Sequence, residues 1–97
     1  MKTATQRTEP VQFEMGTVCL TLETCERLSE KEVDQALRRH AVGDWGTLSQ
    51  HDRDANETAL VQGGRLVSSH RSEAGETFWV VTEAHRRVTT VRFPQEY

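Results

Sequence analysis

The sequence predicts an α+β fold of the order β-α-α-β-β-β, in which two helices pack on one face of an antiparallel sheet. Residues 29–62 carry apolar side chains at helical spacing between recognisable caps. Residues 65–93 contain short apolar runs separated by turn residues, as in a meander of strands. The 97-residue length suits one domain. We therefore assign residues 11–97 to a single domain and the polar residues 1–10 to a flexible tail.

The N-terminal part of the domain has the alternating apolar pattern of a strand. Val11, Phe13 and Met15 alternate with polar residues, and the alternation resumes over residues 18–22 after a bend at Gly16. This pattern predicts either one kinked strand or a tight hairpin. A threonine at position 21 or 24 could then cap a short turn of helix.

Two longer helices follow, and each has a start signal and a stop signal. Ser29 and Glu32 form the capping-box pattern, and apolar residues at helical spacing extend this helix to about Ala41. Ser49 caps the second helix, which has a narrow apolar stripe rich in alanine. Glycines that follow each helix end it.

The last third of the chain predicts three strands joined by tight turns, at residues 65–70, 78–84 and 88–93. The second of these is the most apolar and is expected at the centre of the sheet. Two alternating sets of residues could face the helices, and a shift of one residue exchanges them. The sets are Trp79, Val81 and Val91, or Phe78, Val80 and Val88.

Composition limits the classes of partner. The formal net charge of -3 gives the molecule no general attraction for nucleic acid or for an anionic membrane. The C-terminal third is mildly basic and carries arginine but no lysine. No stretch has the length and apolar character of a signal peptide or a transmembrane helix, so we expect a cytoplasmic protein.

The two cysteines, Cys19 and Cys25, are too few for a disulfide framework and do not form a CxxC pair. We expect both to be buried and inert, because a free cysteine usually behaves as a small apolar residue. The four histidines lack the spacing of metal ligands, and Gly63-Gly64 lacks the lysine of a phosphate loop. We therefore expect no metal and no cofactor.

Several short sequence motifs in the chain are specific enough to support a comparison with known proteins. They include Gly43-Asp44-Trp45-Gly46, Gly63-Gly64-Arg65-Leu66 and Trp79-Val80-Val81-Thr82-Glu83, followed by Pro94 and Tyr97. On the basis of these motifs, the stretch from about Met15 to Tyr97 resembles a group of small bacterial proteins associated with plasmids and phages. The resemblance implies a mobile-element setting and supplies no activity.

The predicted order of elements is also similar to that of RelE/ParE-type toxins, and this resemblance implies a ribonuclease. Cleavage of RNA without a metal needs a base, an acid and a cation that stabilises the phosphorane. His40, Arg65 and Glu83 could supply these groups if the first long helix packs over the sheet. The other reading of His40, on the apolar side of its helix, is a buried histidine with hydrogen-bond partners.

Other residues are candidates for contacts with a partner, namely Asp44, Trp45, Asp52, Asn56, Arg71 and Arg87. An exposed Trp45 would be a contact anchor, whereas a buried one would fill the helix junction while Asp44 bonds backbone amides in the turn. Acidic side chains over residues 49–57 and 23–34 could meet a basic nucleic-acid-binding protein, or could simply be solvated.

The sequence thus favours a non-enzymatic accessory protein of a mobile element that acts by binding another protein. It would be an inhibitor of a host defence system, of the anti-CRISPR or anti-restriction type, with a nucleic-acid-binding host complex as its partner. The alternative is a RelE-like ribonuclease toxin of a toxin–antitoxin system. A third reading is a homodimeric accessory protein without an inhibitory role.

Overall fold

The computed structural model describes residues 10–95, which form an α+β fold, as predicted. Most of the tail assigned to residues 1–10 lies outside the described residues. In chain order the elements are β1 (Thr17–Leu20), α1 (Leu22–Arg27), α2 (Glu30–Ala41), α3 (Gln50–Gln62), β2 (Leu66–Arg71), β3 (Thr77–Thr82) and β4 (Val88–Arg92). No helix in this part of the chain has the length and apolar character needed to cross a membrane.

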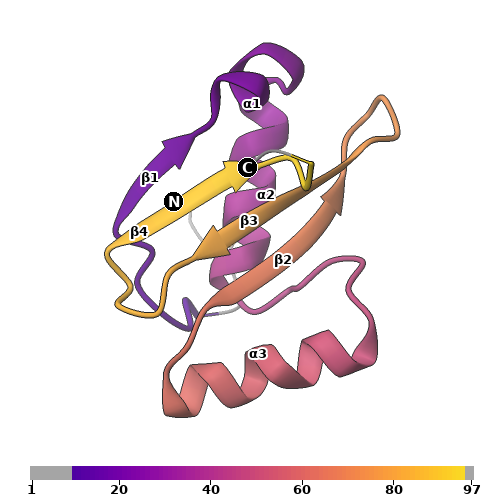
Figure 1. Cartoon of the computed structure of the whole chain (residues 1–97). Coiled ribbons are helices and arrows are strands. Elements are labelled where there is room, and N and C mark those ends of the chain that lie inside the picture. Colours follow the sequence, from indigo (N-terminus) through magenta and orange to yellow (C-terminus); the bar gives the residue numbers. More distant parts are fainter. Residues whose placement is uncertain (1–9, 96–97) are drawn as a thin grey trace, which may run out of the picture.

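The strands form one sheet in the order β1-β4-β3-β2 (Figure 1). β2, β3 and β4 are antiparallel, as predicted, but β1 runs parallel to β4. The expectation of a fully antiparallel sheet is therefore wrong at β1. Three helices and a β-hairpin separate β1 from β4 along the chain, and a connection of that length permits parallel pairing.

The N-terminal alternation predicts too long a strand. Residues 11–16 run without strand pairing, and β1 has only four residues before the chain enters α1. Gly16 adopts φ +67°, and a Cβ placed there would lie 2.3 Å from the carbonyl oxygen of Arg87. The preceding apolar residue Phe13 instead packs its ring against those of His40 and Trp45. The alternation thus reflects packing of an extended segment rather than sheet pairing.

The helix caps agree with the sequence. Thr21 caps α1, Ser29 and Glu32 form the complete capping box of α2, and Ser49 caps α3. Each side-chain oxygen accepts from a backbone N–H in the first turn of its helix, which otherwise has no partner within the helix. Gly63 ends α3 at φ +89°.

The main core lies between α2 and the central strands. α2 crosses behind β3 and β4 in the view of Figure 1. Side chains from both layers form one cluster, which consists of Leu28, Val33, Ala36, Phe78, Val80, Val91 and Phe93. Phe78 and Val80 of one predicted set therefore face the helix, together with Val91 of the other. Val80 is paired directly with Val91, so their side chains share a face of the sheet.

The last helix occupies a different position from the one predicted. α3 lies along the edge of β2 rather than over the face of the sheet (Figure 1). Trp45, Ala59 and Leu66 form a second buried cluster there. The Asn56 amide donates to the carbonyl of Val67 at 2.8 Å and accepts from its N–H at 3.1 Å. The packing of α3 therefore closes one edge of the sheet.

Candidate functional site

His40, the candidate base, is completely buried, with 0% of its surface exposed. It lies on α2 and points at the sheet. Its Nδ1 lies 2.7 Å from Ser68 Oγ, and its Nε2 lies 2.9 Å from Thr82 Oγ1. Both ring nitrogens thus have partners within the core, so His40 cannot contact a substrate at the surface.

Arg65 and Glu83 lie together, but on the opposite side of the sheet. Arg65 Nε is 3.4 Å from Glu83 Oε1, and both residues line a depression of about 300 Å³ with Trp79. Leu66 and Thr82, their neighbours in β2 and β3, face the helices, so Arg65 and Glu83 face the other way. The structure therefore does not bring His40 together with the other two candidate catalytic residues.

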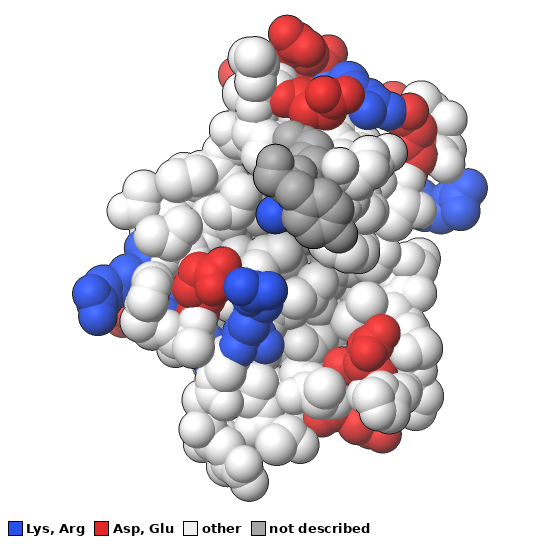
Figure 2. All heavy atoms as spheres, in the orientation of Figure 1, with Lys and Arg blue, Asp and Glu red and all other residues white. Residues whose placement is uncertain are grey.

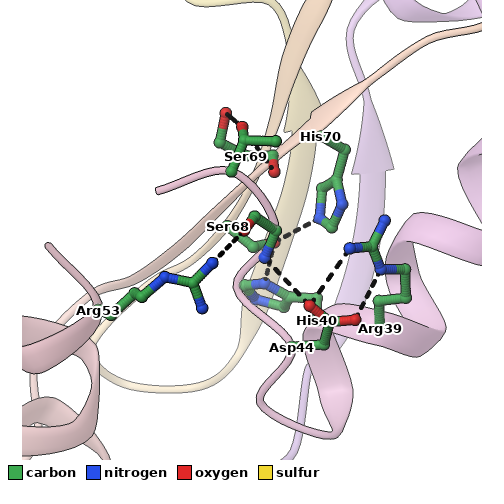
Figure 3. A network of polar contacts seen from close by, with 9 residues as sticks. Arg39, His40, Asp44, Arg53, Ser68, Ser69 and His70 are labelled. Carbon is green, nitrogen blue, oxygen red and sulfur yellow. Dashed lines mark hydrogen bonds and ion pairs between the residues drawn. The ribbon is translucent and has the colours of Figure 1, made fainter. Parts of the chain in front are cut away.

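A chain of polar groups runs through the core from His70 to the backbone before β1, and Figure 3 shows the part of it formed by His70, Ser68 and His40. His70 Nε2 lies 2.8 Å from Ser68 Oγ, and Thr82 Oγ1 lies 2.7 Å from Thr89 Oγ1. At the far end, Thr89 donates its hydroxyl proton to the carbonyl of Met15 at 2.7 Å. Since a carbonyl can only accept, the direction of this last hydrogen bond is fixed.

That fixed bond determines the proton positions along the whole chain. The single hydroxyl proton of Thr89 is already donated to Met15, so Thr82 must donate its own hydroxyl proton to Thr89. Thr82 can then only accept from His40, which donates through Nε2–H. His40 Nδ1 then accepts from Ser68, and Ser68 accepts from His70 Nε2–H. His40 is therefore neutral and protonated on Nε2, and His70 donates through its Nε2–H.

Burial reinforces the neutral state. Desolvation, with smaller contributions from His70 and Arg86, lowers the pKa of His40 to about 3. Desolvation and the nearby Arg39 lower the pKa of His70 to about 4, although Asp44 opposes the shift. His70 Nδ1 has no protein partner among the described residues. The network is a structural element from His40 to Thr89, because the side chains of His40, Ser68, Thr82 and Thr89 are completely buried.

Asp44 and Trp45 form a structural turn, which supports the second of the two sequence readings. Asp44 accepts from Arg39 at 2.8 Å and from the backbone N–H of Gly46, and the hydrogen bond from Arg39 is the main cause that lowers the pKa of Asp44. Trp45 is only 2% exposed and donates to Glu57 at 2.9 Å. Trp45 is therefore not a contact anchor at the surface.

The remaining candidate contact residues are scattered. Asn56 is buried and hydrogen-bonds the backbone of Val67 at the β2 edge. Asp52, Arg71 and Arg87 are exposed at three separate places in the fold. Asp52 lies in the first turn of α3, Arg71 ends β2, and Arg87 precedes β4. These residues do not form one surface.

A groove that the sequence analysis did not identify lies between β1, α1 and α2. Its volume is about 350 Å³, and its apolar lining includes Leu20, Leu28, Val33 and Leu37. Its remaining lining residues are Thr24, Cys25, Glu30 and Asp34. The acidic stretch over residues 23–34 was a usable signal, but only the tertiary structure shows that it borders an apolar groove.

The cysteine prediction is wrong. Both Cys19 and Cys25 are exposed free thiols. β1 is an edge strand and α1 is a short helix at the margin of the sheet, so neither element is covered on its outer side. Within residues 10–95, no group of three or more His, Cys, Asp or Glu side chains is placed to hold a metal ion.

Comparisons with protein-family models, with curated proteins and with solved structures found no match for this chain.

Proposed function

We propose that this chain is a non-enzymatic protein-binding protein, and that its groove between β1, α1 and α2 receives an apolar, positively charged segment of the partner. The observation that carries the proposal is the groove itself. It has a volume of about 350 Å³, and its lining is mainly apolar and includes carboxylates. Small-molecule pockets have volumes from about 300 Å³ upward, so a groove of this size has room for side chains of a partner.

The apolar lining would supply most of the affinity. Leu20 is 40% exposed at the mouth of the groove, where it lies beside residues of the main core. Each large aliphatic side chain that a partner buries in the groove would contribute about 1.5–3 kcal/mol. The binding contact would thus extend the main core of the protein outward.

The acidic residues would select the partner. Glu30 and Asp34 line the groove, and the exposed Glu26 lies on the neighbouring α1. Carboxylates around an apolar site favour lysine and arginine in the partner and accelerate its association at low salt. A basic segment of a nucleic-acid-binding complex has this chemistry. We therefore retain, as a proposal, a cytoplasmic mobile-element protein that inhibits a host defence system of the anti-CRISPR or anti-restriction type.

The ribonuclease alternative has less support from the geometry. The sheet separates His40 from Arg65 and Glu83, and both nitrogens of His40 are engaged in the core. A catalytic base must reach the proton that it removes. We therefore treat ribonuclease activity as an outcome that would contradict the proposal.

The test is capture of a partner by the tagged full chain from cells that carry the native defence systems. The wild type should retain a stoichiometric protein, and Asp34→Lys should reduce its recovery at least tenfold. Asp54→Lys makes the same charge change on the exposed surface of α3 and should recover as much as the wild type. Equal recovery by both variants would overturn the groove as the binding site.

A second arm addresses ribonuclease activity. Expression of the chain alone should leave growth unchanged, and the purified protein should not degrade RNA. Growth arrest that Arg65→Ala relieves, with catalytic turnover of RNA, would contradict a purely binding function. Arg65 is suited to this arm because it is exposed, so its replacement leaves the core intact.

A further inference from the structure

The two edges of the sheet differ in how they are protected. The β2 edge is closed by Asn56 and by a parallel bridge between Gly46 and Ser69. β1 forms the opposite edge, and no described helix or strand lies beyond it (Figure 1). An unprotected edge strand is a template for another strand.

The backbone of β1 leaves two residues with outward-facing polar groups. Thr17 donates its N–H to the carbonyl of Arg87, just before β4, at 2.9 Å, and Thr21 donates to the carbonyl of Val91 in β4 at 3.2 Å. Because alternate residues of a strand face alternate sides, Val18 and Leu20 direct their N–H and C=O groups away from β4. Natural edges are commonly blocked by charged residues or proline, and the sequence Thr-Val-Cys-Leu of β1 contains neither.

We propose that β1 pairs antiparallel with β1 of a second copy of this chain, around a two-fold axis that passes at Cys19. In this register Val18 exchanges two hydrogen bonds with Leu20 of the second copy, and Leu20 does the same with Val18 of the second copy. Centring the axis on Val18 would use Gly16, which has φ +67°, and centring it on Leu20 would use Leu22, which is helical. The register at Cys19 alone pairs both outward residues of the strand.

The side chains fit this register. Val18 and Leu20 face the helix side of the sheet and are 41% and 40% exposed. Each would lie opposite an apolar residue of the second copy, which removes both from water. Since Leu20 lines the groove, Val18 of the second copy would continue the groove floor across the axis.

Charge also favours a second copy in the antiparallel orientation. Arg87 lies beside the start of β1, because its carbonyl accepts from Thr17, and Glu26 lies on α1 just after the end of β1. Both side chains are exposed, and neither has an ion-pair partner within residues 10–95. An antiparallel pair brings the Arg87 end of each copy next to the α1 end of the other. Electrostatic attraction between Arg87 of one copy and Glu26 of the other would then accelerate association.

Figure 2 shows the sheet face that α2 does not cover, where the surface over the strands is mostly uncharged. Cys19 is an exposed residue of this face, because it is paired with Thr90. Across the two-fold axis, the two copies of Cys19 form a non-hydrogen-bonded pair with Cα atoms about 4.5 Å apart. This separation falls within the disulfide range of about 4.4–6.8 Å, so Cys19 reports directly on the proposed register.

The experiment is oxidation of the full chain by diamide, which accepts the two electrons and two protons that a pair of thiols releases. Cys25→Ser should form a disulfide-linked dimer at least tenfold faster than Cys19→Ser on non-reducing gels. Cys25 is the matched control because it is an exposed thiol outside β1. Equal rates, or faster linkage through Cys25, would overturn the register.

Sedimentation equilibrium in reducing buffer tests the dimer without a covalent bond. One short strand pair buries less than the roughly 1,200 Å² of a standard interface, so the wild type should dimerise in the micromolar range or above. Val18→Lys places like charges near the axis and should weaken the dimer at least tenfold with an unchanged circular dichroism spectrum. A wild type that stays monomeric up to about 1 mM would overturn the inference. Partner capture and its loss in Asp34→Lys test the groove, whereas disulfide formation and sedimentation test the dimer. Either proposal can therefore fail without the other.

Discussion

Each polar group between His70 and Met15 has a defined donor or acceptor role, and His40 stands at the centre of the network. Polar groups buried this deeply stabilise a fold when their hydrogen bonds are made, and within the described network only His70 Nδ1 lacks a protein partner. The position of His40 on the apolar side of its helix was predictable from sequence. Its partners Ser68 and Thr82 were not, because they come from strands 28 and 42 residues further along the chain.

Replacing His40 by alanine should destabilise the protein by about 3 kcal/mol, because it opens a cavity and removes partners of two buried hydroxyls. Urea unfolding measures the loss. His51→Ala is the matched control, since the side chain of His51 is 93% exposed. Its stability should stay within about 0.5 kcal/mol of the wild type. If His40→Ala leaves the free energy of unfolding unchanged, the network does not have the structural role assigned to it.

The same burial predicts acid sensitivity. Both histidines titrate near 6.5 when unfolded, but the pKa values in the folded chain are about 3 for His40 and about 4 for His70. Above about pH 6.5 neither form takes up protons, so these residues impose no pH dependence. As the pH falls below 6.5, only the unfolded chain becomes protonated. Stability should therefore decrease by up to about 1.4 kcal/mol per pH unit for each histidine.

Denaturation curves between pH 7 and pH 4.5 check this prediction. His70→Gln removes one of the two groups and should roughly halve the slope. The carboxylates with lowered pKa values, Asp44 and Glu32, begin from 3.8 and 4.5, so their effect comes mainly at lower pH. A flat stability profile across this range would show that the histidines are not held neutral.

At the scale of elements, local signals located the two longer helices and three of the strands, and they left the start of α1 open between Thr21 and Thr24. Capping residues fixed the starts of α2 and α3, and glycine fixed the end of α3. The parallel pairing of β1 was not predictable, because strand pairing depends on contacts with β4 some seventy residues away. The position of α3 along β2 was likewise hidden, since it depends on the amide of Asn56 meeting a strand edge.

The loop before α3 gives a test of this edge closure. Gly46 bridges to Ser69, and a Cβ on Gly46 would lie 1.9 Å from the carbonyl oxygen of Ser69. Gly63 has a similarly positive φ, but no atom lies within 4 Å of its Cβ position. Both changes to alanine should therefore incur about 1 kcal/mol of backbone strain, and Gly46→Ala should cost at least 2 kcal/mol more from the clash.

Thermal or urea unfolding of the two glycine variants supplies the comparison. Equal losses would mean that the Gly46 loop yields to the added methyl group. The close contact would then not be essential to the covered β2 edge.

At the scale of the whole molecule, net charge was a poor guide to the candidate site. The value of -3 gave no reason to expect a charged binding surface, yet the acidic residues cluster along α1 and α2 beside an apolar groove. The sequence also missed that the residues proposed for catalysis lie on opposite sides of the sheet. The separation of the catalytic candidates depends on how strands far apart in the chain are ordered, whereas the groove is lined by residues 20–37 alone and depends on how β1, α1 and α2 pack together.

The groove predicts a salt-dependent interaction. Because Glu30 and Asp34 attract a basic partner through partly exposed charges, association should slow several-fold between 50 and 300 mM salt. Surface plasmon resonance with the captured partner measures the association rate. An association rate that does not change with salt would mean that the carboxylates play no part in recognition.

Amide hydrogen exchange on the complex with the captured partner tests the central claim most directly. The account predicts added protection along α1 and the N-terminal half of α2, with unchanged exchange in α3. Added protection confined to α3, or to the sheet face that carries Arg65 and Glu83, would place recognition elsewhere and contradict the account.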